Sequence, residues 1–136
     1  MRKLLLMSSA VVFTISCSSS DDSSNNSSKI TPPAWIQGTW ISMEIYNDTG
    51  YKVGYKFTND DLCTLNVSIE NCWKKLVDDS NTINYPYPIN VEQKISDVEY
   101  RCSITHASQT NHYQFKKISS TTIEILNDGT ILTKIQ

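Results

Sequence analysis

Histidine is scarce in this chain of 136 residues, which contains only His106 and His112. The two flank one short loop. The strand register inferred for that region places His106 on the inner face of a sheet and His112 on the outer face, because successive side chains of a strand alternate. Such a pair is poorly placed to share a metal ion, and no cysteine spacing completes a zinc site. The sequence therefore predicts no metal centre and no cofactor.

Catalytic motifs are also missing. The chain has no G-x-S-x-G, no phosphate-binding loop and no H-E-x-x-H. Glycosidase carboxylates must face each other across a substrate, whereas the acidic pairs here are sequence neighbours in predicted linkers or turns. We interpret them as solvated turn residues and expect no enzyme activity. The pairs are Asp21–Asp22, Asp60–Asp61 and Asp78–Asp79.

Two further absences concern charge and long apolar runs. With 12 basic and 14 acidic residues, the chain has no basic excess that would suggest nucleic acid as a partner. Its N-terminal apolar run, residues 4–15, is about 12 residues long, short of the roughly 18 to 20 that cross a bilayer. Because Arg2 and Lys3 precede this run, it predicts a signal peptide over residues 1–16.

A lone cysteine, Cys17, follows that segment. Ile15-Ser16-Cys17 resembles a bacterial lipobox, without leucine at its usual place. The resemblance implies that Cys17 becomes the acylated first residue, for example with palmitate. The alternative is an ordinary secreted protein with a spare cysteine. Residues 18–22, SSSDD, resemble the acidic segment of surface lipoproteins of Bacteroidetes-type bacteria, which implies the cell envelope and the outer membrane; a plain polar linker is the alternative.

Residues 17–34 are mostly Ser, Asp and Asn and offer too few apolar groups to offset the entropy of ordering them. We expect a disordered tether there. As a flexible coil of about 16 residues it would reach roughly 20 to 25 Å. Residues 35–136 have the length of one domain with a modest core.

Period-two alternation with frequent turn residues predicts antiparallel β structure throughout this domain. We interpret it as all-β, a small antiparallel barrel or a strongly curled sheet with one apolar face. Three hairpins are expected, with loops at residues 48–50, 107–110 and 127–129. They predict the pairs Ile41–Phe57, Met43–Tyr55, Ile45–Val53, Cys102–Phe115, Ile104–Tyr113, Ile123–Thr133 and Ile125–Ile131.

This register turns Trp40 to the outer face and predicts a lining for the interior. The lining residues are Met43, Tyr55, Phe57, Ile104, Tyr113 and Phe115. Further strands are expected at residues 62–67 and 91–95. The apolar residues of 69–77 fall at helical spacing and predict one short helix, with Ser68 as a possible cap. Prolines make residues 85–88 a rim loop or edge.

Once Cys17 is set aside, Cys63, Cys72 and Cys102 remain, and an odd number leaves one unpaired in an oxidising compartment. We favour a disulfide between Cys63 and Cys72, which lie nine residues apart. Cys102 sits between core-facing residues and is interpreted as a buried thiol, which argues against a catalytic role.

Gly38-Thr39-Trp40 resembles the G-x-W start of the first strand in lipocalins. The resemblance implies a small lipocalin-like barrel that binds a small apolar ligand. The chain departs from that pattern in its length, in its lack of a second motif, and in the absence of an arginine after Arg101 to pack on the tryptophan. The alternative is a protein-interaction or inhibitor module at the cell surface. Aromatic residues in or beside irregular segments form a candidate binding surface: Trp73, Tyr85 and Tyr87.

Overall fold

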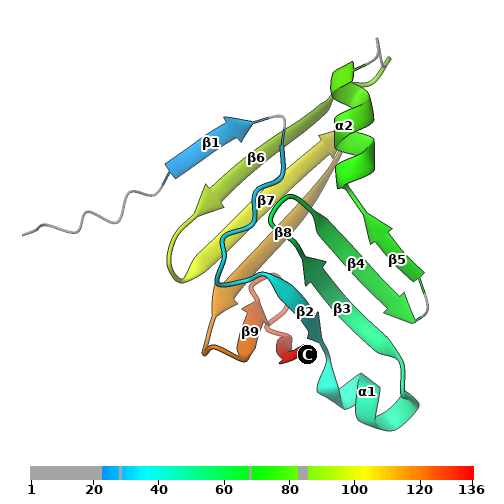
Figure 1. The fold of residues 1–136 in the computed structure, drawn as a ribbon, viewed down its shortest axis with the longest axis vertical. Coiled ribbons are helices and arrows are strands. Elements are labelled where there is room, and N and C mark those ends of the chain that lie inside the picture. Colours follow the sequence, from blue (N-terminus) through cyan, green and yellow to red (C-terminus); the bar gives the residue numbers. More distant parts are fainter. Residues whose placement is uncertain (1–22, 28, 68, 83–85) are drawn as a thin grey trace, which may run out of the picture.

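The computed structural model describes residues 23–27, 29–67, 69–82 and 86–136, and for 23–27 the backbone alone (Figure 1). Two helices lie within these residues, α1 (Met43–Thr49) and α2 (Lys74–Thr82). The strands are β1 (Ser23–Ser27), β2 (Gly38–Ile41), β3 (Lys52–Phe57), β4 (Leu62–Val67), β5 (Ile69–Cys72), β6 (Ile89–Ile95), β7 (Glu99–His106), β8 (Gln109–Lys117), β9 (Thr122–Ile125) and β10 (Ile131–Ile135).

All ten strands form one curled antiparallel sheet, in the order β1-β6-β7-β8-β9-β10-β2-β3-β4-β5. The order describes two meanders, β2–β5 and β6–β10, which the pairing of β10 with β2 joins. The sheet stays open between β5 and the β1–β6 edge. Helix α2 lies at this opening and contacts β6 (Figure 1). The prediction of an all-β, strongly curled sheet is confirmed.

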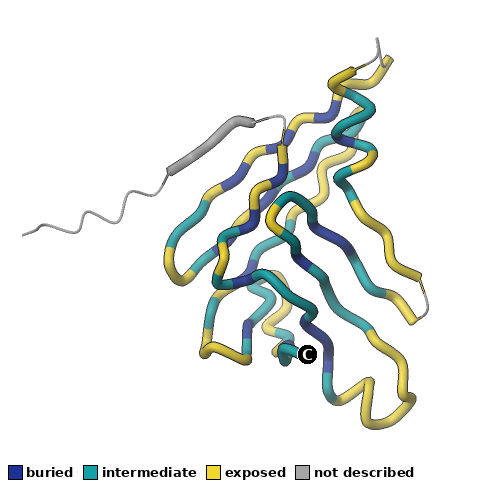
Figure 2. The backbone as a smooth tube through the Cα atoms, in the orientation of Figure 1, coloured by how far each residue is buried: buried dark blue, intermediate teal, exposed yellow. Residues whose placement is uncertain are grey.

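Aromatic rings fill the interior of the curl. Phe57 and Phe115 are buried, with ring centres 5.1 Å apart and planes at 86°, and Tyr55 meets Phe115 at 4.9 Å and 75°. Edge-to-face contacts of this kind add to the stabilisation that comes from burial. Figure 2 shows that buried positions follow the strands around this core, whereas α1 and β5 are exposed along most of their length.

The N-terminal segment closes one end of the curl. Ile30 and Ile36 are buried in the core, and the indole nitrogen of Trp35 donates to the carbonyl of Ser96 at 2.9 Å. The backbone of β1 pairs with β6, with Ser23 opposite Ile95. Described residues before Trp35, which the prediction assigned to the tether, therefore pack against the sheet. Residues 17–22 lie outside the described residues.

The first predicted hairpin has the wrong loop and the wrong register, although residues 38–41 and 54–57 do pair antiparallel. Residues 43–49 form helix α1, because the Ser42 side chain accepts a hydrogen bond from the backbone of Ile45 at its start and Gly50 ends it with a left-handed φ of 74°. Ile41 pairs with Gly54 rather than Phe57. This register shift of three residues turns β2 over relative to β3, so that Trp40, predicted to face outward, is 0% exposed and belongs to the core cluster.

The other two hairpins differ from the prediction by smaller shifts. In β7–β8, Cys102 pairs with Tyr113 across a tighter loop, a shift of two residues that keeps every side chain on its predicted face. In β9–β10, Ile123 pairs with Leu132 rather than Thr133. This shift of one residue reverses β10. Leu132 is consequently buried, whereas Ile131, predicted to face inward, is 50% exposed.

The predicted helix over residues 69–77 exists but begins later, at Lys74. Residues 69–72 form β5 instead, because Cys72 is held to Cys63 on β4 and the Trp73 amide donates to the carbonyl of Leu62 at 3.2 Å. The strand predicted at residues 62–67 is confirmed as β4, and that at 91–95 as part of β6. The proposed cap, Ser68, lies outside the described residues.

Gly54 marks a close approach of β3 to β2. A Cβ atom there would lie 2.0 Å from the carbonyl oxygen of Trp40. We expect Gly54→Ala to lower the free energy of unfolding by about 2 kcal/mol or more, since backbone must move to relieve the overlap. Urea unfolding followed by tryptophan fluorescence measures this loss.

Gly50→Ala is the matched control. Nothing lies within 4 Å of a Cβ atom at Gly50, so only its left-handed φ of 74° opposes the substitution, at about 1 kcal/mol. Equal losses in the two variants would contradict the close approach at Gly54.

Candidate functional site

Two adjoining hollows lie on the inner face of the sheet, and together we call them the inner trough. The first has a volume of about 390 Å³ and the second about 220 Å³. Thr64 borders both, and the rings of Tyr55 and Tyr113, one in each lining, meet edge to face at 6.1 Å. The trough is open to solvent, so it resembles a cleft more than a closed cup.

The first hollow combines an apolar lining with polar groups. Residues from five elements supply the apolar part: Ile45 of α1, Val53 and Tyr55 of β3, Leu65 of β4, Ile125 of β9 and Leu132 of β10. The polar part consists of Ser42, Thr64, Asn66, Asp128 and Thr130. A site of this composition suits a ligand with an apolar body and a few hydrogen-bonding groups.

The second hollow is built around Trp73 and Tyr113. The indole nitrogen of Trp73 donates to the Tyr113 hydroxyl at 2.8 Å. Burial raises the pKa of both Tyr113 and Tyr55 and outweighs the opposing effect of that hydrogen bond on Tyr113. Both phenols are therefore neutral at physiological pH, and each keeps a hydroxyl that can donate to a ligand.

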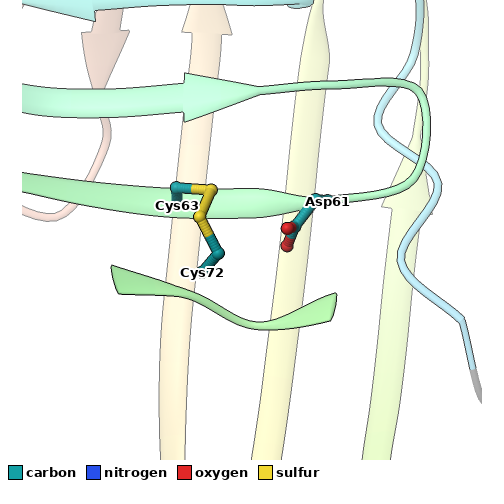
Figure 3. Close-up of side chains that lie close together, drawn as sticks. All are labelled: Asp61, Cys63 and Cys72. Atoms are coloured by element: carbon teal, nitrogen blue, oxygen red, sulfur yellow. A yellow bond between two sulfur atoms is a disulfide. The ribbon is translucent and has the colours of Figure 1, made fainter. Parts of the chain in front are cut away.

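The corner that positions Trp73 is fastened at several points. The disulfide between Cys63 and Cys72, as predicted, joins β4 to β5 directly before Trp73 (Figure 3). The Asp61 carboxylate accepts hydrogen bonds from the backbone amides of Leu62 and Lys74, each at 2.8 Å. The Lys74 amide is one of the donors at the start of α2 without a partner inside the helix, so Asp61 caps the helix from the loop that precedes β4.

Figure 3 also shows why Asp61, Cys63 and Cys72 do not make a metal centre, although their ligand atoms lie within 4.8 Å of one another. The two sulfur atoms are bonded to each other and so are not thiolates, the form in which cysteine binds zinc. One oxygen of Asp61 is already used by two backbone amides.

The six predicted interior residues divide into three groups. Phe57, Ile104 and Phe115 are fully buried and fill the core rather than line a space. Tyr55 and Tyr113 line the trough. Met43, predicted to line the interior, instead begins α1 and is half-buried, because the helix removes it from the sheet.

Trp73 and Tyr87, the two predicted binding aromatics that the structure describes, have different surroundings. Trp73 lines the second hollow, whereas Tyr87 is exposed and stands edge-on to the His106 ring at 6.5 Å. Tyr85 lies outside the described residues. His106 and His112 occupy opposite faces in the register, and His112 contacts the Ser103 hydroxyl at 2.9 Å on the outer face.

Sequence reasoning missed Lys134. Its ammonium lies 5.3 Å from the centre of the Trp40 ring, and Lys134 and Trp40 are partners across the β10–β2 pair. Gly38 leaves room for this side chain, since a Cβ atom there would lie 2.5 Å from its Cε. A search for arginine alone overlooks it; a basic residue of either type in the last strand would have been the signal.

Comparisons of the chain with protein-family models, curated proteins and solved structures found no match. Within the described part of the chain, neither helix is long and apolar enough to cross a membrane.

Cys102, predicted to be a buried thiol, is 1% exposed and unpaired with another cysteine. Burial raises its pKa from the ordinary 9.0 to about 11. As the pH rises, the thiol therefore loses its proton in the unfolded chain before it does so in the folded protein. The stability that the neutral thiol contributes is fully present below pH 9 and is lost as the pH rises towards 11. We expect the free energy of unfolding to fall by about 2 to 3 kcal/mol over that range because of this thiol.

Denaturant unfolding at successive pH values measures this contribution, with Cys102→Ala as the control for other groups that titrate there. The cavity left by the substitution lowers the free energy of unfolding by the same amount at every pH. The comparison therefore uses only how steeply the free energy of unfolding falls with pH in each protein. Parallel pH profiles would contradict the assignment.

Proposed function

We propose that the protein is an exported, membrane-anchored lipoprotein whose curled sheet binds a small apolar ligand in the inner trough. The observation that carries the binding half is the trough itself, an apolar lining with hydrogen-bonding groups on the face that elsewhere is filled by aromatic rings. The lipobox-like residues before Cys17 support the anchor.

The resemblance to lipocalins gains support from the pairing of β10 with β2, which we call the seam of the sheet. Trp40 of the G-x-W stretch is buried at the start of the meander, and Lys134 in the last strand packs on its ring. A basic side chain over that tryptophan is what the resemblance implies, with lysine in place of arginine. This support concerns the fold, while the ligand is argued from the lining of the trough.

The anchor is tested with Cys17→Ser in the full chain expressed in a Gram-negative host. Lipidation needs the thiol, so we expect the wild-type protein to partition into the detergent phase of envelope extracts and the variant to move to the aqueous phase. Equal partitioning of both would overturn the proposed anchor.

Ligand binding is tested with N-phenyl-1-naphthylamine, an apolar dye that fluoresces when it leaves water. We expect saturable binding that Ile125→Asn weakens roughly tenfold, because an unpaired amide in the trough costs about 1 to 2 kcal/mol. Ile131→Asn is the matched control, since this isoleucine of the next strand faces solvent. Mass spectrometry of gently purified protein identifies any natural ligand.

A dye affinity that Ile125→Asn leaves unchanged, or that Ile131→Asn lowers equally, would contradict binding in the trough. The second candidate function, a protein-interaction module, would then be favoured by the exposed apolar side chains of the α1 region and the β4–β5 turn. These are Ile45, Tyr46, Tyr51, Val67 and Ile69.

A further inference from the structure

The pairing of β1 with β6 fixes where the chain leaves the domain. Ser23 lies opposite Ile95 and Ser27 opposite Val91, so residues 23–27 belong to the sheet. Six peptide units separate Cys17 from Ser23. They span at most about 20 Å when fully extended and about 13 Å as a flexible coil. If Cys17 is lipidated, as proposed above, this end of the domain is held close to the bilayer.

Two turns come together at the end where β1 begins. The β6–β7 turn follows Ile95, and Lys117, the last residue of β8 before the β8–β9 turn, donates its amide to the Val98 carbonyl of that turn at 2.7 Å. Each turn exposes one aliphatic side chain: Val98 and Ile118 are both 53% exposed. We call this pair of turns the tether end. Figure 1 shows the start of β1 beside the β6–β7 turn.

Trp35 supports the tether end from inside. Its indole nitrogen donates to the Ser96 carbonyl in the β6–β7 turn at 2.9 Å, and the Lys117 ammonium lies 6.0 Å from its ring centre. The two turns are therefore anchored to the core segment that closes this end. Because these turns are already held in place, Val98 and Ile118 can contact another surface without the entropy cost of first ordering a loop.

Residues that line the trough lie toward the other ends of the strands that start at the tether end. Strand β9 runs from the β8–β9 turn at Thr122 to Ile125, which lines the trough, and the following turn contributes Asp128 and Thr130. Strand β2 likewise runs to α1 at the trough from Gly38, which lies against Lys134, and the Lys134 amide donates to the carbonyl of Thr121 in the β8–β9 turn. Because both strands run from the tether end towards the trough, the tether end and the lining of the inner trough are separated along the strands.

We propose that the tether end rests on the lipid surface of the bilayer through Val98 and Ile118, and that the inner trough consequently opens away from the membrane. A tether this short keeps the two turns at a high effective concentration near the lipid, so that a weak apolar contact persists. The occupant is lipid rather than protein because the covalent chain delivers this end, and no other, to the bilayer.

The test uses the full lipidated chain in phosphatidylethanolamine–phosphatidylglycerol vesicles that contain lipid with a nitroxide on the headgroup. One reporter is a fluorophore on Asp97→Cys at the tether end, and the other is on Tyr51→Cys beside α1. Both residues are exposed, and the buried Cys102 reacts slowly. We expect quenching at position 97 and little at 51. Equal quenching, or stronger quenching at 51, would overturn the proposal.

Two variants test the named contacts in the Asp97→Cys background. Val98→Ser with Ile118→Ser is expected to reduce the quenching, and so is an insertion of about twelve Gly and Ser residues between Asp22 and Ser23, which releases the domain from the surface. Unchanged quenching in either variant would contradict the proposed contact.

Flotation of Cys17→Ser with the same vesicles separates the two proposals. If that variant floats like the wild type, the lipid anchor is wrong, whatever the reporters show. If it stays behind and the reporters fail, the anchor stands and the orientation is wrong. Dye binding in the trough is independent of both outcomes.

Discussion

The pairing of β10 with β2 is the constraint on which the rest of the structure depends. It joins the two meanders, because it sets the last strand of the second meander, β10, against the first strand of the other, β2. Trp40 lies at this seam, fully buried, with its indole nitrogen donating to the carbonyl of Ile36 at 2.6 Å. Because Lys134 covers the ring from β10, one side chain ties the N-terminal segment, both meanders and the C-terminal strand together.

The curl follows from that seam and from the backbone beside it. Gly54 lets β3 approach the backbone of Trp40 more closely than any side chain would allow. Sheets bend where a residue without a side chain permits such an approach. Since β3 carries Val53 and Tyr55 to the inner trough, the bend also decides where the lining of the trough faces.

The sequence was sufficient to predict the β class and the one-sided sheet, because alternation of apolar residues is a local signal. The register in which the strands pair was harder to predict. Ser42 and Gly50 suit a hairpin as well as a capped helix, and the two are distinguished by the strand pairing that sets Trp40 opposite Tyr55 and Ile41 opposite Gly54. That choice depends on packing between distant strands. A shift of two residues in β7–β8 left the faces correct, whereas a shift of one residue in β10 exchanged Ile131 for Leu132.

The disulfide was predictable because the number of cysteines restricts the choices, and the helix was predictable from its spacing but not its start. Its start depends on the Asp61 side chain, which reaches the Lys74 amide from 13 residues away. The trough was only half predictable. Aromatic lining residues are conspicuous in a sequence, but a threonine such as Thr64 looks the same whether a strand turns it to solvent or to a ligand.

The opening of the sheet gives the second hollow its character. Between β5 and β6 no pairing of the described strands links the two meanders. Helix α2 covers the gap there and buries its own Val77 side chain. The ion pairs of Lys74 with Asp60 and Asp78 are exposed and contribute little to holding the helix. The firmer link is the hydrogen bond from Trp73, directly after β5, to Tyr113 on β8. A ligand beside these two rings would touch both meanders at once, so its binding would stabilise the sheet where backbone pairing does not.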